Sequence, residues 1–192
     1  MISIGLFGLT KVVKLAVPLI AQDEEFWCVP ACIKMVIEYM NGGGRMTVPI
    51  PSLTLREIAR IVKTEDGTRA HQVPLMNPRM EEAVPSVEFE DDYKVRMVDE
   101  IEDENKNLRP TIAWMTLTDG IHRNWGHAVV ITDIDRAMNR ITYNDPGPPR
   151  ENTQPLSAFE TVWERSYTTL VKIQIGKKTR TVLTQFTEQE KQ

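Results

Sequence analysis

The chain has 192 residues, of which 41% are hydrophobic and 26% charged, and its formal net charge is −4. This size and composition predict one globular domain over residues 1–192. The chain has no basic stripe, which excludes a general nucleic-acid binder, because phosphate affinity needs clustered Lys and Arg. The apolar opening, residues 1–9, is too short to span a bilayer and lacks the flanking charges of a signal peptide. We therefore expect a cytoplasmic protein with no membrane partner.

The first elements in chain order are a strand and a buried helix. Residues 14–20 are an apolar run interrupted by Pro18, which predicts an edge strand. Residues 30–40 predict a helix that begins at Pro30 and ends at the glycine-rich stretch 41–44. This helix is apolar almost all round, so we expect it in the middle of the core.

A second helix and a long irregular segment follow. Residues 55–63 predict the helix, with Ser52 or Thr54 as its N-cap. Residues 67–93 hold three prolines and little periodicity, which predicts mostly loop. A long insertion in a compact domain is usually functional or disordered, so we expect this segment to cover or flank a cleft.

The second half of the chain predicts mainly strands. An acidic amphipathic helix over residues 97–107 comes first. Runs rich in β-branched and aromatic residues then predict strands over residues 111–117, 128–134, 140–144 and 167–175. Ser157 and Glu160 form a capping box for a short helix that bears Phe159 and Trp163. Helices followed by an antiparallel sheet give an α+β fold class.

The two cysteines, Cys28 and Cys32, lie four residues apart. This spacing on one helix suits a disulfide poorly, so we expect reduced thiols. Cys28 lies at the N-terminal edge of the predicted buried helix, where unpaired amides and the positive dipole end favour a thiolate nucleophile. The alternative is that Cys28 is a small apolar core residue, as we expect Cys32 to be. The spacing does not match the usual zinc sites, and we expect no metal or cofactor.

A nucleophilic cysteine needs a base, and the chain has three histidines. His71 lies in the Pro-rich segment and His122 in a polar turn, so we expect both at the surface. His127 follows Gly126 and precedes an apolar strand. An imidazole at the mouth of a strand is held rigidly and can face a cleft, as a Cys–His pair requires. A histidine at a strand edge without a catalytic part is the alternative.

The base needs an orienting partner, and Asp145 is the candidate. It follows a strand that returns antiparallel to the strand of His127, so it is expected within about three residues of the position opposite His127. Asp145 can also serve as a turn former before Pro146. Asn144 stays open as the orienting residue, because a one-residue slip exchanges which side chain faces the cleft.

Gln22 stands six residues before Cys28. Its amide can donate a hydrogen bond to a developing oxyanion, alongside the backbone N–H of Cys28. A solvated loop glutamine is the alternative.

These motifs, taken in order, resemble the papain-like cysteine peptidase superfamily. Within it they resemble more closely the branch of double-glycine leader peptidases that process bacteriocins. The motifs are Gln22, Cys28-Val29-Pro30-Ala31, Gly126-His127-Ala128-Val129-Val130 and Tyr143-Asn144-Asp145-Pro146. The similarity runs from about residue 14 to about residue 175, so we expect the core of the domain over these residues and a tail over residues 176–192. It implies a papain-like fold, with an N-terminal helical half that holds the catalytic helix and a C-terminal antiparallel sheet.

The resemblance also implies a role for each matching residue. Gln22 would form the oxyanion hole, Cys28 would attack, His127 would act as base and acid, and Asp145 would orient it. The expected function is hydrolysis of peptide or isopeptide bonds in a peptide or protein substrate. The same residues would serve deamidation or amide transfer, and a non-catalytic peptide-binding module that keeps the fold is a further alternative.

Overall fold

The computed structural model describes residues 14–42, 50–63, 67–68, 72–92, 98–118, 124–165 and 170–175. Its helices are α1 (Cys28–Asn41), α2 (Leu55–Val62), α3 (Val73–Ala83), α4 (Val98–Lys106) and α5 (Leu156–Glu164). Its strands are β1 (Val87–Asp92), β2 (Thr111–Thr118), β3 (Asn124–Asp135), β4 (Arg140–Pro146), β5 (Pro149–Pro155) and β6 (Leu170–Ile175). The strands form one antiparallel sheet in the order β1-β6-β2-β3-β4-β5. The predicted α+β class is confirmed.

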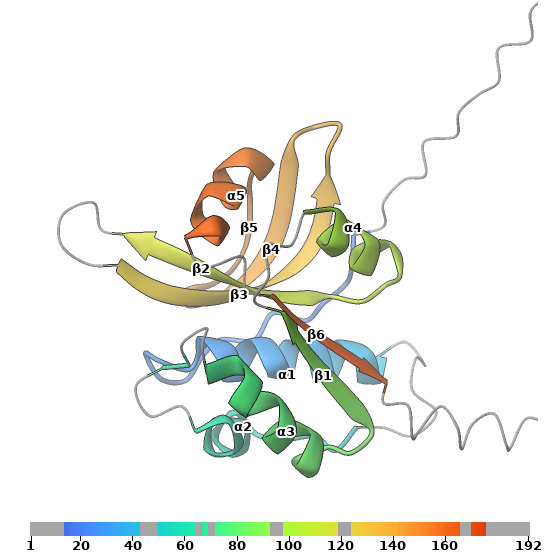
Figure 1. Cartoon of the computed structure of the whole chain (residues 1–192), viewed down its shortest axis with the longest axis vertical. Coiled ribbons are helices and arrows are strands. Elements are labelled where there is room, and N and C mark those ends of the chain that lie inside the picture. The colour runs from blue at the N-terminus through green and yellow to red at the C-terminus, as the bar shows by residue number, and fades with distance from the viewer. Residues whose placement is uncertain are drawn as a thin grey trace, which may run out of the picture.

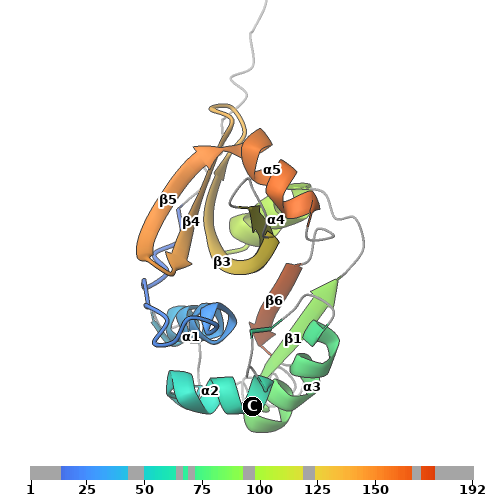
Figure 2. The ribbon, with the colours of Figure 1, turned by 90° about the vertical axis from the view of Figure 1, so that its left-hand side faces the viewer.

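Helices cover both faces of the central strands. α1, α2 and α3 gather on one side, and α4 and α5 lie on the other (Figures 1 and 2). Successive residues of β2 reach opposite cores: Ile112 packs with the α1–α3 side, whereas Ala113 packs with the α4–α5 side. In β3, Val130 and Val129 divide in the same way. Burial on both faces explains why these strands are continuous apolar runs.

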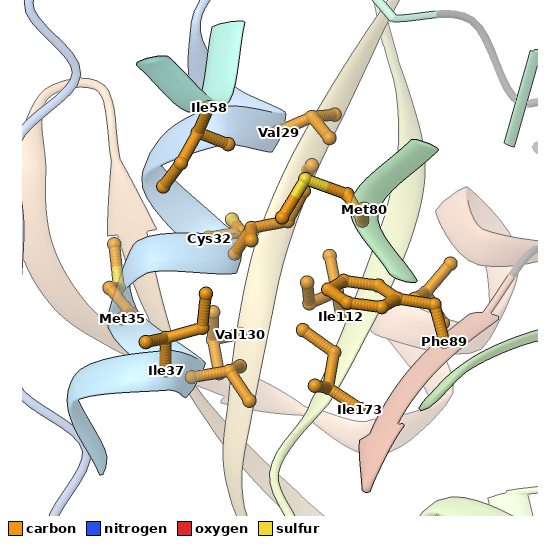
Figure 3. Packing of buried hydrophobic residues seen from close by; sticks show 14 of the residues in the cluster. Val29, Cys32, Met35, Ile37, Ile58, Met80, Phe89, Ile112, Val130 and Ile173 are labelled. Carbon is orange, nitrogen blue, oxygen red and sulfur yellow. The ribbon is translucent and has the colours of Figure 1, made fainter. Parts of the chain in front are cut away.

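α1 is the centre of the larger core. Its residues Val29, Cys32, Met35 and Ile37 lie among side chains from α2, α3 and the sheet (Figure 3). The helix begins at Cys28, two residues before the predicted start at Pro30. Proline is tolerated there because the first turn of a helix has N–H groups without intrahelical acceptors. The expected position of Cys28, at the N-terminal end of a buried helix, is confirmed.

The strand predicted over residues 14–20 is wrong, because this segment forms no strand. The Leu15 N–H donates to the Thr132 carbonyl oxygen at 2.9 Å, which ties the segment to β3. Further along, the Val17 carbonyl oxygen accepts from the Asn144 side chain, and Pro18 has no N–H to donate. The segment lies against the sheet without a continuing ladder.

The loop predicted over residues 67–93 is also wrong for residues 72–92. That part forms α3 and β1, and its residues Met76 and Met80 are buried in the larger core. The helix was not predicted because prolines usually end helices. Here one proline lies in the first turn of α3, and Pro78 lies inside the helix. The segment is thus mainly part of the core. Gly67, at its start, lies beside Phe26, which precedes Cys28 by two residues.

The two predicted helix caps have different outcomes. Thr54 caps α2 in a complete capping box, with its hydroxyl accepting from the Glu57 N–H and the Glu57 carboxylate accepting from the Thr54 N–H. The capping box predicted from Ser157 and Glu160 is wrong, because α5 already begins at Leu156. Asn139 supplies the contacts there instead: its carbonyl oxygen accepts from the Leu156 N–H at 3.0 Å.

The remaining predicted elements of the second half are confirmed, with shifted ends. The helix predicted over residues 97–107 is α4, and the four predicted strands are β2, β3, β4 and β6. Phe159 and Trp163 are buried in α5 and stack at 5.9 Å between ring centroids. β5 was not predicted. The apolar opening, the tail, His71 and His122 lie outside the described residues. No helix in the described ranges is long and apolar enough to cross a membrane.

Candidate active site

Three elements bring Cys28, His127 and Asp145 together. Cys28 is the first residue of α1, His127 lies in β3, and Asp145 lies near the end of β4. All three are buried, with 9%, 8% and 8% of their surface exposed, respectively. The prediction that His127 stands at the mouth of its strand is wrong, because β3 begins three residues earlier, at Asn124. Residues 124–126, which precede His127 in β3, pair with β2, and His127 itself lies opposite Met115.

His127 and Asp145 are in direct contact. The His127 Nε2 atom lies 2.7 Å from the Asp145 Oδ1 atom, in a buried position. The strand register explains this contact, since Val130 lies opposite Asn144 and the next pair along would be Val129 and Asp145. Asp145 is thus two residues from the position opposite His127, inside the predicted range of three. Residues two apart along a strand share a face, so both side chains point the same way.

Asn144 points to the other face of the sheet. Its Nδ2 atom donates to the Val17 carbonyl oxygen at 2.9 Å, in a buried position. The alternation of side chains along β4 therefore gives Asp145, and not Asn144, the contact with the imidazole. Asn144 holds the N-terminal segment against the sheet.

The Asp145 carboxylate has two further donors. Its Oδ1 atom accepts from the Gly147 N–H at 2.9 Å, and its Oδ2 atom faces the Asn152 Nδ2 atom at 3.4 Å. Gly147 lies in the turn between β4 and β5, and Asn152 lies in β5. Sequence reasoning missed Asn152 because β5 is largely exposed and has no apolar alternation to reveal it.

The Cys28 side chain also acts on the imidazole of His127 and raises its pKa. Burial by itself lowers the pKa of His127, but hydrogen bonds to Asp145 and Cys28, with the charges of both residues, raise it more. The result is a pKa of about 9 instead of 6.5. Because Nε2 faces Asp145, Nδ1 is the nitrogen that serves the thiol. At neutral pH the imidazole therefore holds a proton, and it can pass this proton to a group bound at the thiol.

Cys32 lies one turn deeper in the same helix and is fully buried. Burial raises the pKa of its thiol well above the ordinary value, and the negative charges of Cys28 and Asp145 raise it further. Both cysteines are free thiols in the structure. Cys32 therefore stays a neutral core residue, as the sequence predicts.

Gln22 lies next to the turn that follows β4. Its backbone N–H donates to the Pro146 carbonyl oxygen at 3.0 Å. Its Nε2 atom donates to the carbonyl oxygens of Glu24 and Glu25, at 2.9 and 2.7 Å. Both amide hydrogens are thus engaged by the loop before α1, and the oxyanion role of Gln22 stays a prediction. Within the described ranges, no three His, Cys, Asp or Glu side chains are grouped to hold a metal ion.

A cysteine at the start of a buried helix, facing a His–Asp pair on an antiparallel sheet, places this chain in the papain-like cysteine peptidase superfamily. More specifically, the model of the peptidase C39-like family matches residues 14–171, and the chain belongs to that family. The family and the fold are those of cysteine peptidases, and the bacteriocin-processing branch is the one the sequence resembles.

A solved structure supports the fold. A candidate C39-like peptidase from Bacillus anthracis superposes with a TM-score of 0.63 at 15% sequence identity, covering 86% of this chain and 98% of that one. No curated protein matches the chain.

Proposed function

We propose that this chain hydrolyses peptide or isopeptide bonds, with Cys28 as nucleophile and His127 as general base and acid. One observation carries the proposal: His127 Nε2 lies 2.7 Å from Asp145 Oδ1 in a buried position, and Cys28 is near enough to the imidazole to raise its pKa. A nucleophile, a base and a group that orients the base are what covalent catalysis by a thiol requires. Thiolate chemistry needs a reduced Cys28, which fits a cytoplasmic location.

The reaction proceeds through a thioester. The Cys28 thiolate attacks the substrate carbonyl carbon, a C–S bond forms, and the carbonyl electron pair moves to oxygen. The His127 imidazolium gives its proton to the leaving amine as the C–N bond breaks. Water then attacks the thioester while His127 takes its proton, and collapse of this second intermediate releases the acid and regenerates the thiolate. Asp145 holds the imidazole in the orientation and tautomer that both proton transfers need.

The oxyanion would be held by the backbone N–H of Cys28 and by the side chain of Gln22. The first N–H groups of a helix have no intrahelical acceptor, so the start of α1 is suited to an anion. Gln22 must exchange one of its bonds to Glu24 or Glu25 to reach the oxyanion. We expect Gln22→Ala to lower kcat by roughly tenfold to a thousandfold with little change in KM. A large change in KM at unchanged kcat would make Gln22 a substrate-binding residue instead.

The decisive test compares the two cysteines. Cys28→Ala should abolish peptide hydrolysis, measured by mass spectrometry of the products, and should leave the free energy of unfolding within about 1 kcal/mol. Cys32→Ala is the matched control, because it removes the other thiol, one helical turn away. This variant should retain turnover. Hydrolysis that persists in Cys28→Ala would reject the proposal.

The products separate hydrolysis from the other reactions open to this site. A peptidase yields two fragments, and the new carboxylate carries one oxygen from labelled water. A deamidase yields ammonia from an intact chain, and a transferase yields an amide with the added amine. The peptidase C39-like family favours the first result.

A further inference from the structure

The turn that follows β4 contacts both the acid of the proposed triad and the proposed oxyanion residue. The Gly147 N–H donates to Asp145 Oδ1 at 2.9 Å. One residue earlier, the Pro146 carbonyl oxygen accepts from the Gln22 N–H at 3.0 Å. The two groups that must act together around the thioester are therefore held by adjacent residues of one turn.

Gly147 also makes room for the Gln22 side chain. A Cβ atom at position 147 would lie 2.6 Å from Gln22 Oε1, 2.7 Å from Cδ and 3.2 Å from Nε2. Two of these distances are shorter than real Cβ contacts, so the amide could not stay in place beside a larger residue. All three of the nearest atoms belong to Gln22, and no positive φ at Gly147 explains the glycine.

The orientation of the Gln22 amide is set by its acceptors, and its position needs the space beside Gly147. Its Oε1 atom is buried without a hydrogen-bond partner, while Nε2 faces the carbonyl oxygens of Glu24 and Glu25. Rotating the amide by 180° would turn the oxygen toward two acceptors, so the donors must point toward the loop before α1. Gly147 is the surface on the opposite side, against which the amide oxygen rests.

We propose that Gly147 is a positioning residue for catalysis, whose N–H holds Asp145 and whose missing side chain leaves the space for the Gln22 amide. The inference rests on the proposed function, and in particular on Gln22 as an oxyanion donor. It makes one residue contribute to the alignment of both the proton-transfer pair and the oxyanion donor. Adding a methyl group should disturb only the second, because the backbone N–H remains.

Gly147→Ala tests this separation. The clashing group is the end of a flexible side chain, so the variant should fold, with a Tm within a few degrees of the parent. The displaced amide should lower kcat by about tenfold or more, as far as Gln22→Ala does, with little change in KM. Alkylation of Cys28 by iodoacetamide passes through no oxyanion, so its rate and pH profile should stay as in the parent.

A double variant tests the cause. In Gln22→Ala/Gly147→Ala the clash is absent, so kcat should equal that of Gln22→Ala alone, a fully non-additive result. Gly42→Ala is the control: it adds the same methyl group where nothing lies within 4 Å, at the far end of α1. That variant should have parental kcat and KM.

Several outcomes would overturn the inference. Parental turnover of Gly147→Ala, additive losses in the double variant, or a changed alkylation profile would each do so, and so would parental turnover of Gln22→Ala. If Gly147→Ala does not fold, the double variant must fold, because its Cβ has room; failure of both would assign Gly147 a different constraint. The proposed function fails separately, if Cys28→Ala remains active in the same assay or if the products are those of deamidation or amide transfer.

Discussion

Replacing Asp145 by Asn should lower the pH at which the enzyme loses activity on the alkaline side. The substitution keeps the size of the side chain and an oxygen that can face His127 Nε2. It removes the negative charge that lies 2.7 Å from that nitrogen. The hydrogen bond that the imidazole donates to Asp145 is the largest of the effects that raise the pKa of His127, so this substitution removes the main interaction that stabilises the imidazolium.

The structure gives the size of the effect. The pKa of His127 is raised from 6.5 to about 9 although burial lowers it. At 1.36 kcal/mol per pH unit, this net rise favours the imidazolium by roughly 3 kcal/mol. Cys28 contributes a part of the rise and burial remains, so we expect the pKa in Asp145→Asn to fall by more than one unit. We expect kcat to fall by at least about tenfold as well, because an amide also stabilises the wrong imidazole tautomer.

The same shift has a consequence for stability. A histidine whose pKa is higher in the folded state than in the unfolded state stabilises the fold fully below the unfolded value, and this stabilisation is lost as pH rises through the folded value. For His127 the window runs from 6.5 to about 9. In Asp145→Asn, the loss of stability across this window should become smaller.

The assay is the pH dependence of kcat/KM, with the free energy of unfolding measured across the same range. Asp133→Asn is the matched control, because it makes the same change at the other end of the β3–β4 hairpin, six residues along from His127. Its alkaline limb should stay near the parental value. If the alkaline limb of Asp145→Asn also stays near pH 9, the contact does not set the protonation of His127, and the reasoning is refuted.

Three further predictions follow from single sites. Iodoacetamide at about pH 6 should label Cys28 much faster than Cys32, because Cys32 is fully buried with a raised pKa, and equal rates would count against an activated thiolate. Trp125 is 46% exposed and lies two residues before the proposed base, on the same strand face, where it can contact the substrate. Trp125→Ala should therefore raise KM by about fivefold. Met138 is 68% exposed in the distant turn, and Met138→Ala should leave KM unchanged. Thr54→Ala should cost about 1 kcal/mol of unfolding free energy in denaturant titration, and a negligible cost would show that the cap of α2 is redundant.

Local patterns predicted the elements whose signal is periodic. α1 is apolar nearly all round and ends at Gly42, β2 and β3 hold continuous apolar runs, and β4 begins with β-branched and aromatic residues, so their places were predictable. α3 was missed because Pro78 marks a helix break in most contexts, yet here Met76 and Met80 anchor the helix in the core. β5 was missed because its pairing with β4 depends on backbone hydrogen bonds. Its side chains are mostly exposed, so its sequence has no alternation of apolar and polar residues.

The same distinction separates the parts of the site. Asp145 could be placed beside His127 because strand alternation leaves only two faces, and the register then decides between Asp145 and Asn144. Gln22 lies in an irregular loop, where spacing to Cys28 limits how far the side chain is from the thiol but says nothing of which acceptors its amide meets. The acceptors are backbone carbonyl oxygens of the same loop, and the contact with Gly147 depends on how this loop meets the turn after β4. Regular structure carries the His127–Asp145 pair, so its geometry can be worked out from the sequence, whereas the place of Gln22, the proposed oxyanion donor, depends on loop packing that only the three-dimensional structure defines.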